Sequence, residues 1–342
     1  MKQGCKFFNL VLLFLLFITI IFSLFYGSVK VPIEDVIKIL LNKVGNFDFP
    51  IEKKSFTSIV FYVRLPRILV AVLVGGALGI SGCTMQSLLK NPIADSSIVG
   101  ISSGASLGAV IAISFGLTNR YIFAMPIFSI LLSLLVATIV YTLASLKGRT
   151  DNLLLILSGI AISSFVGAIS SLLLTTMMES QLKEYIFWSV GSLSGRRWEH
   201  FTFSAIPIMI LSFILIYYGK ELNILLLGDE EAKSLGINIR ELRKKVLMIV
   251  SVITSISVCI SGNIGFVGLI VPHILRKLIG ADNRKLLKSS FLAGAFFLTL
   301  CDLISRTIFS PKELGVGIVT AIIGAPYFMY LILKIRRGGK SL

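Results

Sequence analysis

Long stretches without a charged residue alternate with short basic segments along most of the chain. The uncharged stretches cover residues 7–29, 68–89, 96–119, 121–146 and 152–178. Each reaches the ~20 residues that a helix needs to cross a bilayer. The pattern predicts an all-α, polytopic membrane protein with about ten transmembrane helices, in a single domain over residues 1–342. The predicted spans lie near 7–26, 65–88, 97–117, 121–146, 152–177, 200–219, 244–261, 264–280, 289–308 and 314–334.

Three apolar stretches need separate interpretation. The uncharged run 246–275 is too long for one crossing and is interrupted by Gly-Asn-Ile-Gly at 262–265, so we expect two helices joined by a tight turn. Residues 184–195 are too short to cross and indicate a half-helix or interfacial segment. The first apolar run is longer than the roughly 7–15 residues of a signal-peptide core, so we expect this helix to be retained.

The composition and the charge distribution agree with this class. Charged residues make up 15% of the chain, against about 25% in soluble domains. The net charge is +16, but the sequence contains no nucleic-acid-binding motif. With the N-terminus inside, the inner segments hold twenty Lys and Arg residues and the outer segments twelve. Basic residues concentrate on the cytoplasmic side of membrane proteins, so both termini are predicted to be cytoplasmic.

The sequence carries no recognisable catalytic motif. Walker A, GxSxG and HExxH patterns are absent, which excludes the corresponding ATPase and hydrolase classes. The four cysteines and two histidines lack metal-ligand spacing, so we expect no metal, no cofactor and no enzymatic activity. His273 is expected to have a packing role.

Few charges fall inside the predicted spans. Asp302 and Arg306 lie one helical turn apart, and we expect them to pair with each other. An ion-driven carrier would normally show several intramembrane carboxylates. Transport driven by a separate motor is therefore the main hypothesis, and an ion-coupled secondary transporter acting without an ATPase partner is the alternative.

Glycines recur at intervals of four in two predicted helices. Gly75 and Gly79 share a face of the first, and Gly100, Gly104 and Gly108 share a face of the second. Such faces let neighbouring backbones approach closely, and ordinary helix packing explains any single glycine.

The largest predicted cytoplasmic loop, 220–245, has its own helical pattern. Acidic residues follow Gly228, where the positive end of a helix dipole favours them. Gly236 is expected to end this short helix, and a second helix from Asn238 to Lys245 runs into the next span. The pattern predicts a compact knob on the surface; a solvated turn is the alternative.

Five segments, taken together, identify a family. They are RLPR at 64–67, SGCTMQSLLKNPIADSSIVGISSGASLGAV at 81–110, LGDEEAKSLGINIRELR at 227–243, GFVGLIVPHILRKLIGADNRKLL at 265–287 and ELGVGIVTAIIGAPYFMYLILK at 313–334. In this order they resemble the iron-siderophore and cobalamin permease family of ABC-type importers, often called FecCD, over roughly 60–334. The chain departs from the family pattern at Asn283, Lys288 and Gly315.

The resemblance implies a type II ABC importer permease fold and a function. It implies the membrane-spanning subunit of an ATP-driven importer for an iron-siderophore, or for haem or cobalamin, in a prokaryotic cytoplasmic membrane. The implied partners are a second permease subunit in a homodimer, two ATP-binding cassette ATPase subunits and an extracytoplasmic substrate-binding protein, with lipid around them. Nucleic acid is not an expected partner.

The resemblance also assigns roles to particular residues. Residues implied to couple to the ATPase are Gly228, Asp229, Glu230, Ala232, Leu235, Gly236 and Arg240. Arg64, Arg67 and Arg306 are implied to dock the binding protein, since guanidinium groups form two-pronged pairs with carboxylates, and we expect Arg306 to extend outward to do so. A translocation pathway is expected along Gly100, Gly104, Gly108, Ser163, Gly167 and Ser171.

Overall fold

The computed structural model describes residues 2–45, 47–121, 123–146, 149–150 and 152–338; the remaining residues of the predicted domain, among them Met1 and 339–342, lie outside this description. Helices account for nearly all of the described elements. They are α1 (Lys2–Phe25), α2 (Ile33–Gly45), α3 (Lys54–Thr57), a π-helix (Ser58–Arg64), α4 (Leu65–Leu88), α5 (Ile101–Ser114), α6 (Leu117–Arg120), α7 (Ala124–Ala144), α8 (Asn152–Thr175), α9 (Glu179–Ser189), α10 (Trp198–Tyr217), α11 (Gly219–Leu227), α12 (Asp229–Ser234), α13 (Ile239–Ser261), α14 (Val267–Ile279), α15 (Asn283–Thr307) and α16 (Val316–Gly338). Strands β1 (Ser145–Leu146) and β2 (Arg149–Thr150) form one short antiparallel pair.

Seven helices among the described residues are long and apolar enough to cross a membrane. These segments are Lys6–Phe25, Lys54–Leu88, Ala124–Ala144, Asn152–Thr175, Trp198–Tyr217, Ile239–Ser261 and Asn283–Thr307. Helix α5 is a shorter apolar helix, Val316–Leu331 is the apolar part of α16, and α14 has 13 residues. Each of the ten segments proposed from the hydrophobic pattern thus contains a helix, and the fold is helical throughout.

Several helix starts differ by a few residues from the pattern-based expectation, and two of them have a clear local reason. Helix α5 begins at Ile101, not near 97, because residues 95–100 form turns that end at Gly100 with a φ of 80°. Helix α15 begins at Asn283, where the side chain of Asp282 accepts a hydrogen bond from the Arg284 N–H. Its first turn is polar, so hydropathy alone places the start too late.

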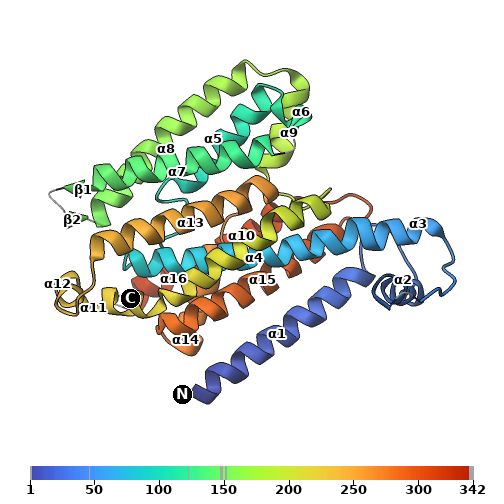
Figure 1. The fold of residues 1–342 in the computed structure, drawn as a ribbon, viewed down its shortest axis with the longest axis horizontal. Helices are drawn as coiled ribbons and strands as arrows, with labels where there is room; N and C mark the ends of the chain where they lie inside the picture. The colour runs from blue at the N-terminus through green and yellow to red at the C-terminus, as the bar shows by residue number, and fades with distance from the viewer. Residues whose placement is uncertain (1, 46, 122, 147–148, 151, 339–342) are drawn as a thin grey trace.

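Figure 1 shows the bundle with α4 in its interior, close to α10, α13 and α15. Helices α5, α7 and α8 form a layer on one side of α13, and α1 runs along the opposite edge of the bundle against α15. Helices α11 and α12, the β1–β2 pair and the C-terminal helix end lie at one end, hereafter the knob end. Helices α2, α3, α6 and α9 lie at the other, hereafter the α2 end.

The glycine face of α4 packs against α15 within the same chain. A Cβ placed on Gly75 would collide with the Gly294 carbonyl, and one placed on Gly79 with the Ser290 carbonyl. Farther along, Gly82 meets the backbone of Gly268 in α14. Close backbone approach of this kind supplies van der Waals contact that lipid chains do not. Ordinary helix packing therefore accounts for the repeat in α4.

Replacing Gly79 by alanine is expected to destabilise the chain by about 1–3 kcal/mol, because the new methyl group forces α4 and α15 apart. Gly167→Ala in α8 is the matched control, since open space surrounds that position and alanine favours helix by up to about 1 kcal/mol. Thermal unfolding of the purified variants in detergent measures both. Equal melting temperatures for the two variants would contradict the packing role of Gly79.

The knob end of the bundle is tied together around Asn283, one of the departures from the family pattern. Its backbone N–H donates to Asn223 Oδ1 at 2.7 Å, and its side-chain oxygen accepts from Ser87 Oγ at 2.7 Å. The Asn223 amide also donates to Asp282 at 2.7 Å. These bonds link α4, α11 and the start of α15.

Candidate coupling knob and buried arginine network

The knob consists of α12 and the turns on either side of it. Gly228, with a φ of 148°, separates α11 from α12, and Gly236, with a φ of 82°, ends the turn after α12. Positive φ values of this size favour glycine, which has no Cβ to collide with its own backbone. The side chain of Asn238 then caps α13 by accepting from the Glu241 N–H at 3.2 Å. The compact two-helix geometry expected from the sequence is present.

Asp229 attaches the knob to two core helices. Its carboxylate accepts from Lys90 Nζ at 2.9 Å and pairs with Arg243 Nη2 at 3.1 Å. Lys90 follows α4, and Arg243 is a buried residue of α13. Partial burial alone would raise the pKa of Asp229, but the Lys90 hydrogen bond and the charge of Arg243 outweigh it, so the pKa lies below its ordinary value. A displacement of α12 is thereby linked to α4 and α13.

The outer surface of the knob exposes apolar side chains. Ala232 is fully buried beneath it, whereas Leu235 is 62% exposed and Leu227 is 68% exposed. Glu230 and Arg240 are exposed around them. A rigid surface that combines exposed leucines with charged neighbours has the composition of a protein interface, with an apolar centre and a polar rim.

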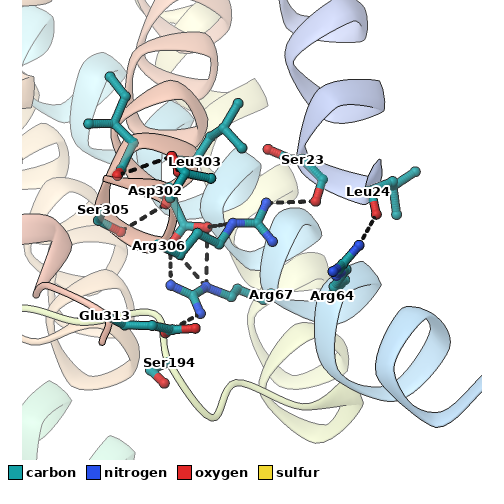
Figure 2. A network of polar contacts seen from close by, with 12 residues as sticks. Ser23, Leu24, Arg64, Arg67, Ser194, Asp302, Leu303, Ser305, Arg306 and Glu313 are labelled. Carbon is teal, nitrogen blue, oxygen red and sulfur yellow. Dashed lines mark hydrogen bonds and ion pairs between the residues drawn. The ribbon is translucent and has the colours of Figure 1, made fainter. Parts of the chain in front are cut away.

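A network of buried charges occupies the α2 end of the bundle (Figure 2). Arg67 Nη2 lies 2.9 Å from Asp302 Oδ1, and Arg67 Nη1 lies 2.7 Å from Glu313 Oε2. Arg306 Nη2 donates to the Ser23 carbonyl at 2.7 Å. Arg64 Nη1 donates to the Leu24 carbonyl at 2.6 Å. The network joins α1, the π-helix, α4 and α15 to the segment before α16.

The geometry confirms one expectation about these charges and corrects another. Arg306 Nε pairs with Asp302 at 3.6 Å as expected, and Arg67, whose Nε and Nη2 both donate to Asp302, is a closer second partner. Arg306 does not extend outward, because its guanidinium group points to the end of α1. Arg64, Arg67 and Arg306 are each at most 4% exposed. In this structure the three arginines hold helices together, and docking of a binding protein by them stays a prediction.

The residues expected along a pathway separate into two groups. Gly104 and Gly108 are buried against the backbone of α7, and a Cβ on Gly100 would lie 3.1 Å from Ser163 Oγ. These three glycines pack closely inside the chain, and their assignment to the pathway stays a prediction. On α8, Ser163 is half-buried, whereas Gly167 and Ser171 are exposed.

A cavity of about 740 Å³ lies at the α2 end, between α9 and the connection from α15 to α16. Its lining includes Glu184, Trp188, Ser194, Arg196 and Glu313. Through Glu313, its wall joins the Arg67 network. Sequence reasoning missed this cavity because Arg196 and Glu313 lie in connections about 117 positions apart with no shared motif; only the polar residues flanking the short 184–195 segment hinted at it.

Metal-binding geometry is not found in the described part of the chain. No group of three or more His, Cys, Asp or Glu side chains there could hold a metal ion. His273 is buried and packs its ring edge-to-face against Tyr327, with 6.4 Å between the ring centroids. This contact is what a packing histidine would make.

The apolar helices, the interlocked glycine faces and the rigid knob define a polytopic helical membrane protein with a surface for a partner at one end. The chain belongs to the FecCD transport family, whose sequence profile matches residues 15–334. The iron-siderophore and cobalamin permease resemblance noted in the sequence is thereby confirmed.

Two relatives and one solved structure extend the comparison. The chain is 39% identical over 329 residues to the uncharacterised ABC transporter permease protein YvrB of Bacillus subtilis, covering 95% of this chain and 93% of the relative. It is 40% identical over 277 residues to the hemin transport system permease protein HmuU of Yersinia pestis, covering 80% and 83%. A structure described as an inward-facing conformation of a metal-chelate type ABC transporter matches with a TM-score of 0.82 and 33% identity, over 96% of this chain and 99% of that one. The chain is a permease subunit of an ABC importer.

Proposed function

We propose that this permease forms half of a dimeric pathway that imports an iron chelate, with a second copy of the chain as the other half. The likeness to a metal-chelate type transporter and to a hemin permease supports a bulky chelate as substrate. Other relatives are named for cobalamin, molybdate and iron(III) citrate. The substrate that we propose is an iron-siderophore, which is an iron chelate as iron(III) citrate is.

ATP hydrolysis is assigned to two partner ATPase subunits that bind the knob, and the chain itself performs no covalent chemistry and binds no cofactor. The observation that carries this assignment is the attachment of α12 to α4 and α13 through Asp229, Lys90 and Arg243. Movement of the ATPase would then rotate the bundle largely as a rigid body. In this proposal the knob end and both termini lie in the cytoplasm of a prokaryotic cell.

At the α2 end we propose that an extracytoplasmic substrate-binding protein docks and that the cavity near Glu313 receives the chelate. The cavity has both charged and apolar walls, which suits a chelate with polar and apolar surfaces. The exposed small residues Gly167 and Ser171 are assigned to the wall of the pathway between the two copies.

Reconstitution tests the proposal against the ion-coupled alternative. The permease is placed in proteoliposomes with its ATPase and its binding protein, and uptake of a radioactive iron-siderophore is measured. We expect uptake to require ATP and all three components and to survive an ionophore. Uptake by the permease alone, abolished by an ionophore and indifferent to ATP, would establish the ion-coupled carrier.

Docking at the α2 end is tested by Arg64→Gln. In the part of the chain that the structure describes, Arg64 pairs with no carboxylate; its guanidinium group donates to the carbonyls of Leu24, Phe25 and Val29. If its charge guides the binding protein, the variant binds it more weakly and with less dependence on salt, since charges at physiological ionic strength are screened beyond about 8 Å. Lys312→Gln is the control on the nearby connection. Affinity unchanged by Arg64→Gln at low and high salt excludes the docking role.

A further inference from the structure

We propose that α2 is an interfacial helix that lies in the outer surface of the bilayer that the long helices cross, with one face embedded among the lipids. The proposal concerns how the chain is seated in its membrane, and it is independent of the substrate. It rests on the faces of α2, on the direction of its axis and on the surface next to it.

Helix α2 has a wider apolar surface than the bundle covers. Val36 and Ile39 are fully buried against the bundle, in a cluster with Leu24 of α1 and Ile68 of α4. A second stripe, at intervals of four residues, points away from that cluster. Its members are Ile33, 52% exposed, Ile37, 46% exposed, and Leu41, 43% exposed. At 100° per residue these three share one side of the helix.

The remaining side of α2 is polar. Glu34, Lys38 and Asn42 follow one another at intervals of four and lie beside the exposed apolar stripe. Helix α2 therefore presents three sides in turn: one to the bundle, one apolar and unpartnered within the chain, and one polar. A helix with this division binds at a membrane surface, with its apolar side about 5–10 Å into the boundary between headgroups and acyl chains.

The axis of α2 has the direction that such binding needs. In Figure 1 the long helices run across the view, whereas α2 is seen nearly end-on beside the last turn of α1. Its axis thus runs across the bundle, parallel to the plane of a membrane that the long helices cross. A helix in this orientation can lay its full length along the bilayer surface.

The surface next to α2 supports lipid as the occupant. Along α1, at the edge of the bundle, the apolar side chains of Phe7, Leu10, Phe14 and Phe17 are exposed, and so are those of Tyr26 and Val29 in the connection to α2. Helix α1 is a candidate membrane span with 28% of its apolar window buried inside the chain, so its open side faces lipid.

The segment after α2 adds an aromatic anchor. Phe47 and Phe49 are exposed and stacked with their ring centroids 5.6 Å apart. Two hydrogen bonds between the Asn42 side chain and the Phe49 backbone, both 2.9 Å, hold this segment against α2. Aromatic rings concentrate at the interfaces of membrane proteins.

The net charge of the α2 region does not favour a charged protein partner over lipid. Residues 27–54 contain five lysines and four acidic residues, so the α2 region carries almost no net charge. Its binding energy would come from apolar contact, which a bilayer interface supplies over the entire length of the helix.

Spin labelling in vesicles tests the proposal. The full permease, with Cys5→Ser and with its buried cysteines kept, receives a nitroxide through Ile37→Cys or Leu41→Cys and is reconstituted in phosphatidylethanolamine–phosphatidylglycerol vesicles. Lys38→Cys and Glu34→Cys are matched controls on the polar side. We expect labels at 37 and 41 to be several-fold more accessible to oxygen, which partitions into lipid, than to a water-soluble nickel complex. The controls are expected to show the reverse order.

Three outcomes would overturn the proposal. Equal nickel accessibility at all four positions would place α2 in water. Labels at 37 and 41 shielded from both reagents would mean that protein, such as a second copy of the chain, covers the stripe. Labels that are open to nickel until the binding protein is added would assign the stripe to that partner.

Discussion

Asp302→Ala is expected to destabilise the permease by about 3–5 kcal/mol, which is the usual cost of removing one partner from a buried ion pair. Asp302 is fully buried and lies 2.9 Å from Arg67 and 3.6 Å from Arg306. Without its carboxylate, two buried guanidinium groups lose their shared counter-charge, and Glu313 neutralises one of them in part. The melting temperature of the purified protein in detergent measures the loss.

A double replacement separates the ion pair from packing. In Arg67→Met with Asp302→Leu, the apolar side chains remove both charges at once, and we expect much of the lost stability to return. Glu313→Gln is a second control, because the Glu313 side chain is 24% exposed and its replacement leaves the Arg67–Asp302 pair in place. If the double variant is as unstable as Asp302→Ala, the Arg67–Asp302 pair does not account for the effect, which then comes from packing or from Arg306 left without its carboxylate.

Leu235→Asp is expected to weaken binding of the ATPase at least about tenfold and to reduce ATP-driven uptake to background. A central apolar contact of an interface contributes about 2 kcal/mol or more, and each 1.4 kcal/mol is tenfold in affinity. Leu235 is exposed, so the change should leave the fold of the permease intact. Affinity for the isolated ATPase and uptake in proteoliposomes are the two measurements.

Two variants at the knob calibrate this result. Leu235→Ile keeps an apolar side chain and should retain uptake. Adding Gly236→Pro to Leu235→Asp should also uncouple ATP hydrolysis from substrate, because proline cannot adopt the φ of 82° that this turn requires. Undiminished transport by the double variant would show that the ATPase does not grip the permease here.

Local patterns were sufficient to predict the long helices and the knob. The uncharged stretches are properties of consecutive residues, and helix formation in a membrane depends chiefly on them, since backbone groups in lipid must bond within their own segment. The knob follows the same logic: acidic residues after Gly228 start α12, and Gly236 ends it. Both ends are set within a few positions along the chain.

The contact partners of the charged and small residues could not be predicted from local patterns. Arg67 and Asp302 are 235 positions apart, and the carboxylate one turn from Arg306 pairs chiefly with Arg67 because α4 lies directly against α15. Likewise, the sequence alone allows Gly104 and Gly108 to serve helix packing or to line the pathway. Only the position of α7 shows that they pack inside the chain.

By itself, therefore, the sequence determined a helical membrane protein of the FecCD family, the approximate places of its helices and the turn chemistry of its knob. The tertiary structure decided which glycine faces meet, which charges pair, where the cavity at the α2 end lies and which side of α2 stays uncovered. The physical reason is distance along the chain: hydropathy, capping and glycine φ act over a few residues. A buried contact forms between segments that only the packing of the bundle brings together.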